Sequence, residues 1–108
     1  WADVVAIAPA TANTIAKLAC GIADNALTCM VLALRPETGL LLAPAMNGRM
    51  WSHESTEENV RILASRGAEL VGPSEGLQAC GYQGKGRMSP VEEVLAHVME
   101  MLKERGRA

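Results

Sequence analysis

The chain has 108 residues, of which 49% are hydrophobic and 20% charged, a balance that is typical of one globular domain. A formal net charge of −2 and 3% aromatic residues provide neither the basic surface nor the stacking platform of nucleic-acid-binding proteins, and no apolar run approaches the length that spans a bilayer. The three cysteines lack metal-ligand spacing, so we expect a reduced, cytoplasmic protein without a metal, a disulfide framework, a membrane or a nucleic-acid partner.

Apolar runs and helical patterns alternate along the first half of the chain. Residues 3–8 form a short apolar run that ends before Pro9, which indicates a strand buried on both faces of a parallel sheet. Helices are predicted over residues 13–19 and 25–34 from their apolar spacing and their stop signals. The run at residues 39–44 (Gly-Leu-Leu-Leu-Ala-Pro) predicts a second buried strand.

The second half repeats this alternation. A helix over residues 56–66 is predicted to open with a capping box of Ser55 and Glu58, and residues 68–73 form a weaker third strand. The last helix begins after Ser89, the expected N-cap. The apolar stripe of this last helix comprises Val91, Val94, Leu95, Val98 and Leu102.

The order of these elements predicts the fold class. Strands that alternate with helices indicate an α/β fold, a three-layer α/β/α, Rossmann-like parallel sheet with right-handed βαβ units. Three strands make a poor sheet of this kind, because buried central strands need partners on both sides. We therefore expect residues 1–108 to be the C-terminal portion of a larger domain, whose N-terminal strands are missing from this chain.

The unusual local sequences all follow predicted strand ends. They are residues 9–14 (Pro-Ala-Thr-Ala-Asn-Thr), residues 44–51 (Pro-Ala-Met-Asn-Gly-Arg-Met-Trp) and residues 74–88. Parallel strands deliver their C-terminal ends to one edge of the sheet, where ligands bind. We therefore expect these three segments to meet at one site.

The first segment combines small and polar side chains at the start of a helix. Thr11, Asn13 and Thr14 place hydroxyl and amide groups beside exposed N–H groups, where an anion or a carbonyl oxygen is favoured. The alternative is a plain N-cap turn, with Thr11 as the cap and Asn13 solvated.

The second segment places Asn47 among apolar side chains. Its amide can hold a carboxylate without adding charge, and apolar walls suit the loss of carbon dioxide because they desolvate that carboxylate. The alternative is a turn of Asn47 with Gly48, in which Met46, Met50 and Trp51 are core residues.

The third segment is rich in glycine and holds two cations, Lys85 and Arg87. It lacks the residue order of phosphate-binding motifs and fits better a flexible flap that closes over an anionic substrate. Cys80, near its start, is a candidate acid or nucleophile, the alternative being a structural thiol. Elsewhere we expect packing roles for Cys20 and Cys29 and solvated positions for His53 and His97.

Together the three segments resemble the flavin-containing cysteine decarboxylases. Residues 9–14 resemble the family's Pro-Ala-Ser-Ala-Asn-Thr motif, with threonine in place of serine, and residues 44–51 match its Pro-x-Met-Asn-x-x-Met-Trp motif in full. Residues 79–88 resemble the substrate flap, although Tyr82 and Gln83 stand where acidic residues are common. The resemblance covers nearly the whole chain and is strongest to the members of coenzyme A biosynthesis.

The resemblance implies an FMN-dependent decarboxylation of 4′-phosphopantothenoylcysteine to 4′-phosphopantetheine. In that reaction Asn47 would hold the substrate carboxylate and Cys80 would donate the proton that completes the reduction. The residues implied to contact FMN are Thr11, Ala12, Asn13, Thr14 and Ala45. The residues implied to bind substrate, besides Asn47, are Met50, Ala79, Gly81, Lys85 and Arg87.

The chain also departs from the family's pattern. The family's catalytic histidine and flavin phosphate loop precede the strand that opens this chain, so we expect residues 1–108 alone to bind FMN poorly and not to turn over. The resemblance implies trimers or multiples of trimers, and a complementary N-terminal piece or a fused synthetase domain as a partner. The alternatives are a related flavoprotein that decarboxylates peptidyl cysteine or transfers a prenyl group, and a non-catalytic regulatory subunit of the same fold.

Overall fold

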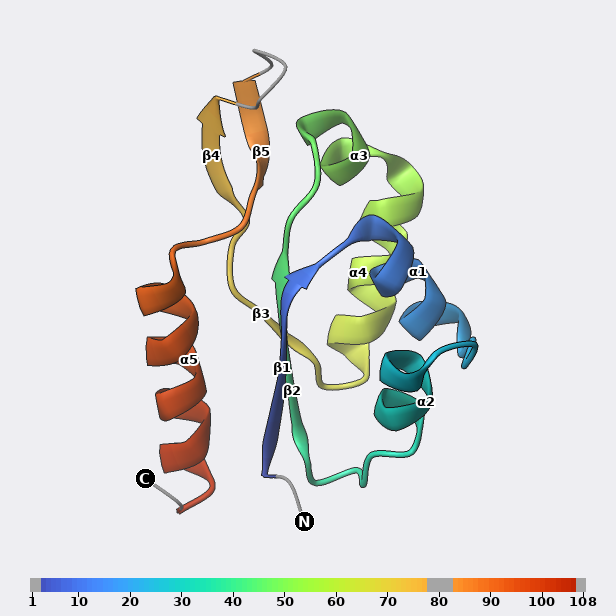
Figure 1. The fold of residues 1–108 in the computed structure, drawn as a ribbon, viewed down its shortest axis with the longest axis vertical. Helices are drawn as coiled ribbons and strands as arrows, with labels where there is room; N and C mark the ends of the chain where they lie inside the picture. The colour runs from blue at the N-terminus through green and yellow to red at the C-terminus, as the bar shows by residue number, and fades with distance from the viewer. Residues whose placement is uncertain (1–2, 78–82, 107–108) are drawn as a thin grey trace.

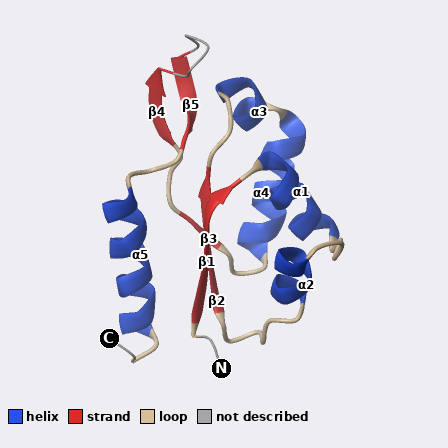
Figure 2. Cartoon of the chain, viewed as in Figure 1, coloured by secondary structure: helices blue, strands red, loops and turns tan. Residues whose placement is uncertain are grey.

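A parallel sheet forms the centre of the molecule. The computed structural model describes residues 3–77 and 83–106, with residues 74–77 and 83–87 described as backbone alone (Figures 1 and 2). The sheet contains β1 (Val4–Ala10), β2 (Gly39–Pro44) and β3 (Glu69–Leu70), in the order β1-β2-β3. The two strong strand predictions are confirmed, whereas the third strand is two residues long.

Helices cover both faces of this sheet, which confirms the three-layer α/β/α arrangement. Helices α1 (Ala12–Cys20), α2 (Ala26–Leu32) and α4 (Glu54–Ser65) lie on one side, and α5 (Val91–Glu104) lies on the other (Figure 1). The short helix α3 (Gly48–Ser52) follows β2. The sequence pattern did not predict α3.

The core has two parts because successive side chains of β2 point to opposite faces of the sheet. Leu42 packs toward α1 and α4, in a cluster with Ile7 and Leu63. Its neighbour Leu41 packs toward α5, in a cluster with Met101. Leu41 and Leu42 are both fully buried, which confirms that this apolar run belongs to a strand covered on two faces.

The apolar stripe predicted for α5 is wrong in part. Val94 is buried and Val98 packs against the same cluster, but Val91 and Leu95 are 57% and 58% exposed. Together with Met99, which is 53% exposed, these two residues form an exposed line along the helix, here named the outer row. The physical reason is that the sheet contacts only one side of α5. The apolar residues of this helix occupy a wider arc than that side, so some of them stay exposed.

The starts of two helices also differ from the prediction that Ser55 and Ser89 cap them. Helix α4 begins at Glu54, directly after α3, and its cap is His53, whose Nδ1 accepts a hydrogen bond from the Ser55 N–H at 3.0 Å. Helix α5 has Pro90 at its N-cap position without a side-chain cap bond, and Ser89 is buried. In both cases a neighbouring residue takes the position that the sequence pattern gave to serine.

The predicted flap contains regular structure. Strands β4 (Ser74–Leu77) and β5 (Gln83–Arg87) pair antiparallel and form a two-stranded ribbon that is separate from the main sheet. The ribbon stands at the end of the molecule that also carries α3 (Figure 1). Residues 78–82, which separate β4 from β5 in the sequence, lie outside the described residues.

Candidate functional site

The segments that follow β1 and β2 meet at one edge of the sheet, as predicted. The Ala45 N–H donates a hydrogen bond to the Ala10 carbonyl at 3.0 Å. This bond joins the turn after β1 to the turn after β2 at the point where the two strands end. Helix α3 contacts β5, which brings the ribbon to the same end of the molecule (Figure 1). The sequence pattern gave no sign of the backbone bond between the turns, because it depends on the strand register and not on side chains.

The first turn is a well-formed helix cap. The Thr11 hydroxyl oxygen accepts a hydrogen bond from the Thr14 N–H at 3.2 Å, and the same hydroxyl donates to the Thr14 hydroxyl at 3.1 Å. The N-cap interpretation therefore holds for the local structure. Thr11 and Asn13 are nevertheless exposed, so their polar groups are accessible to a ligand beside the N–H groups of the first turn.

The second turn is also a cap. The Asn47 side-chain oxygen accepts a hydrogen bond from the Met50 N–H at 2.9 Å, and Gly48 is the first residue of α3. Because Oδ1 is engaged by the helix, Nδ2 is the group that Asn47 can offer to a ligand. Asn47 is exposed and Met50 is 45% exposed, so this amide stands next to accessible apolar surface.

The third segment is described in part. Cys80, Ala79 and Gly81 lie outside the described residues, so their predicted roles stay predictions. Lys85 and Arg87 belong to β5, of which the backbone is described. Strand β5 contacts α3, the helix that Asn47 caps, so the ribbon lies beside the second turn.

Residues outside this cluster correct two sequence predictions. His97 is not simply solvated, since its Nε2 lies 2.9 Å from Glu69 Oε1 and joins α5 to β3, whereas His53 is exposed and caps α4. Cys20 and Cys29 are exposed and are not packing residues. They stand on the outward sides of α1 and α2, whose inward sides are filled by larger aliphatic side chains.

The described residues contain neither a cluster of metal-ligating side chains nor a helix that could cross a membrane. Among residues 3–77 and 83–106, no three His, Cys, Asp or Glu residues are grouped so that they could share a metal ion. None of the helices in this part of the chain has the length and apolar character needed to cross a membrane.

The donor set at the two turns fits a flavin. Small residues, Ala12 and Ala45, stand beside accessible hydroxyl and amide groups, and a planar ring system can approach backbone most closely where side chains are small. The first turn of α1 adds backbone N–H groups, which favour electronegative atoms of a ligand.

Comparisons with known proteins agree with this arrangement. The flavoprotein family model matches residues 1–103. The bifunctional coenzyme A biosynthesis protein CoaBC of Haemophilus influenzae is 43% identical over 105 residues, which cover 97% of this chain and 26% of the relative. Mouse phosphopantothenoylcysteine decarboxylase is 43% identical over 107 residues, which cover 98% of this chain and 52% of the relative.

Solved structures show the same fold. A mutant of PPC decarboxylase in complex with pantothenoylaminoethenethiol matches with a TM-score of 0.91 and 38% identity, over 95% of this chain and 57% of that one. The FMN-binding protein AtHal3 matches with a TM-score of 0.86 and 38% identity, over 96% and 56%. This chain thus spans about half the length of these proteins and about a quarter of the bifunctional relative. Because a family model matches nearly its full length, the chain belongs to the flavoprotein family.

Proposed function

We propose that this chain carries part of the active site of an FMN-dependent enzyme that decarboxylates 4′-phosphopantothenoylcysteine to 4′-phosphopantetheine in the cytoplasm. The observation that carries the proposal is the hydrogen bond between Ala45 and Ala10, which holds the Thr11 cap and the Asn47 cap side by side at adjacent strand ends. One turn then serves the cofactor and the other serves the substrate. The names of the relatives at 43% identity support the same reaction.

FMN would be held by the first turn. Its contacts would be Thr11, Ala12, Asn13, Thr14 and Ala45. The hydrogen bonds between Thr11 and Thr14 fix both hydroxyl groups before any ligand arrives. A ligand that binds these groups therefore loses little free energy to the ordering of side chains. When bound, the flavin supplies a two-electron oxidation of the substrate thiol and later returns the electrons.

Asn47 would orient the substrate carboxylate. Its oxygen is held by the Met50 N–H, so the side-chain amide is fixed and Nδ2 can donate to a carboxylate oxygen. The accessible side chain of Met50 adds apolar surface beside that carboxylate. Carbon dioxide is neutral and the carboxylate is not, so a water-poor environment favours its loss.

The flap would complete the site. Cys80 would donate the proton that finishes the reduction, and Ala79, Gly81, Lys85 and Arg87 would contact the substrate. Two cations suit a substrate that carries a phosphate group. The contact between β5 and α3 supports this role, because α3 is the helix that Asn47 caps.

We also propose that further strands complete the sheet beyond β1. Among the described residues β1 pairs with β2 alone, and Ala6 and Ala8 are exposed although they lie in a central apolar run. The outer row of α5 is a second stretch of exposed apolar surface. A complementary N-terminal piece would cover both, and the family resemblance supports assembly into trimers and fusion to a synthetase domain.

The proposed function is tested with the complete protein that carries this chain. The protein is incubated with FMN and 4′-phosphopantothenoylcysteine, and 4′-phosphopantetheine and carbon dioxide are measured by mass spectrometry. We expect both products in equal amounts, and none without FMN. A peptide with a C-terminal cysteine is the comparison substrate, and turnover of that peptide in place of 4′-phosphopantothenoylcysteine would contradict the proposed substrate.

A further inference from the structure

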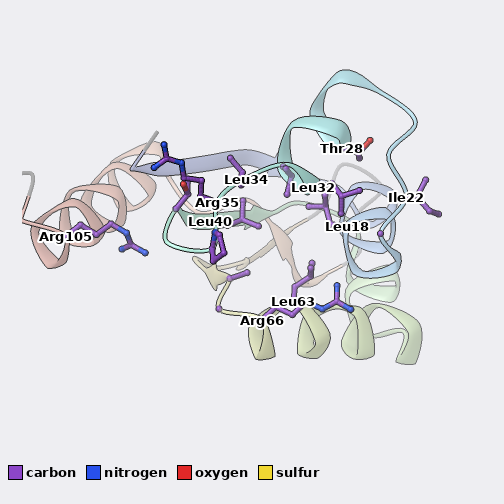
Figure 3. Close-up of a pocket in the computed structure, with 16 residues that line it drawn as sticks. Leu18, Ile22, Thr28, Leu32, Leu34, Arg35, Leu40, Leu63, Arg66 and Arg105 are labelled. Carbon is purple, nitrogen blue, oxygen red and sulfur yellow. The ribbon is translucent and has the colours of Figure 1, made fainter. Parts of the chain in front are cut away.

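A cavity lies at the edge of the sheet opposite the candidate site. Its volume is about 420 Å³, within the range of roughly 300 to 1,000 Å³ that is typical of small-molecule sites. It is enclosed by the ends of α1 and α4, by α2, and by the start of β2 (Figure 3). The cavity lies beside the start of β2, whereas the turns of Thr11 and Asn47 follow the C-terminal ends of β1 and β2. The cavity is therefore separate from these turns.

The cavity has an aliphatic wall. Leu18 and Leu63 are buried members of the core cluster, and Leu40 packs against that cluster. Leu32 stands at the same cavity and is 61% exposed, so apolar surface continues to the solvent. None of the described lining residues is aromatic, which disfavours a stacked nucleobase and favours a flexible aliphatic ligand.

Cations surround this aliphatic wall. Arg35, Arg66 and Arg105 line the cavity, and none of the described lining residues is acidic. Arg35 and Arg105 lie on one side of the cavity, away from Leu18 and Leu63 (Figure 3). Glu37 Oε1 approaches Arg35 Nη1 at 3.5 Å, but both side chains are about two-thirds exposed and the pair is screened by water.

The guanidinium of Arg105 is held in place by its surroundings. Its Nη1 donates a hydrogen bond to the Met101 carbonyl at 3.2 Å. A Cβ atom at Gly39 would come within 2.7 Å of Nη2, so the absence of a side chain at Gly39 is what admits the group. Its Nε is buried and finds no acceptor among the described residues, and a buried donor without an acceptor is costly.

We propose that this cavity binds an aliphatic anion, a short hydrocarbon chain that ends in one carboxylate or phosphate. The anionic head would lie toward Arg35 and Arg105, where guanidinium groups bind such oxygens by charge-assisted hydrogen bonds. The hydrocarbon chain would lie against Leu18, Leu40 and Leu63. This inference concerns a second site and does not depend on the proposed decarboxylation.

The test measures binding of defined probes to the full chain by isothermal titration calorimetry. The probes are octanoate and octyl phosphate, with 1-octanol and octylammonium as comparisons of equal chain length. We expect both anions to bind at least tenfold more tightly than the alcohol, which corresponds to about 1.4 kcal/mol, and the cation to bind no better than the alcohol. Whichever anion binds more tightly identifies the preferred head group. Equal affinity for the anions and the alcohol, or no binding of either anion at millimolar concentration, would overturn the proposal.

Two pairs of variants locate the site. Arg105→Gln is expected to weaken anion binding about tenfold, the equivalent of one charge-assisted hydrogen bond, whereas Arg61→Gln on the exposed surface of α4 leaves it unchanged. Leu32→Asp places a negative charge at an exposed lining position and is expected to weaken binding to a similar extent. Its control is Met30→Asp, on the same helix but outside the lining. Equal losses within both pairs would show that the probes bind elsewhere.

Discussion

Replacing Asn47 by aspartate separates its two roles, as a helix cap and as a carboxylate donor. Asparagine and aspartate are about equally good N-caps, so the oxygen that accepts the Met50 N–H at 2.9 Å is retained and α3 is expected to stay intact. The group that changes is Nδ2, which becomes a carboxylate oxygen. A donor to the substrate carboxylate is thereby replaced by a like charge of similar size and position.

The size of the effect follows from the position of Asn47. Two carboxylates about 4 Å apart repel by about 4 kcal/mol at an effective dielectric constant of about 20. Asn47 is exposed, so about half of that value is a reasonable allowance for solvent screening. Loss of the charge-assisted hydrogen bond adds about 1.5 kcal/mol. The sum, more than about 3 kcal/mol, lowers kcat/KM at least a hundredfold.

The assay compares this variant with Asn25→Asp in the complete protein. Asn25 caps α2 in the same way, its oxygen accepting the Thr28 N–H at 2.8 Å, and it lies outside the strand-end turns. We expect Asn25→Asp to keep kcat/KM within about twofold, since no proposed substrate contact changes. FMN affinity should be unchanged in both variants. If Asn47→Asp retains kcat/KM within about threefold, or if both variants lose it equally, the role given to the Asn47 amide is refuted.

The remaining predictions concern the flap, the cofactor and the contact between His97 of α5 and Glu69. Cys80→Ser is expected to accumulate an oxidised, decarboxylated intermediate, detected by mass spectrometry, and normal product at an undiminished rate would exclude Cys80 as the proton donor. Residues 1–108 by themselves should bind FMN poorly, and a tight yellow complex in a fluorescence titration would contradict this. His97→Ala removes the contact with Glu69 and should lower the free energy of unfolding in urea by about 0.5–1 kcal/mol. If His97→Ala and Glu69→Gln have fully additive effects, the two side chains are not coupled.

The parts of the fold that the sequence predicted are those with strong local signals. The run at residues 39–44 is apolar throughout and ends in proline, and β2 has these bounds. The positions of Thr11 and Asn47 at strand ends were predictable because the C-terminal ends of parallel strands lie at the same edge of the sheet. Local chemistry and strand polarity were sufficient for both results.

The parts that were missed depend on tertiary contacts. The outer row of α5 has the same residue types as the buried row, so composition could not decide which one faces the sheet. His97 lies 28 positions from Glu69, and its neighbours in sequence carry no sign of that partner. The cap of α4 by His53 depends on the arrival of α3, a helix of five residues without a pattern of its own.

The bond between Ala45 and Ala10 has a consequence for how this polypeptide tolerates changes in length. Residues inserted between α2 and β2 would lengthen an exposed connection and leave both turns where they are, at a small entropic cost. One residue inserted within β2 would shift its far end by about 3.3 Å and reverse the faces of every later side chain in the strand. Distant homologues should therefore vary in the length of the connection between α2 and β2, and should have no insertions or deletions within β2.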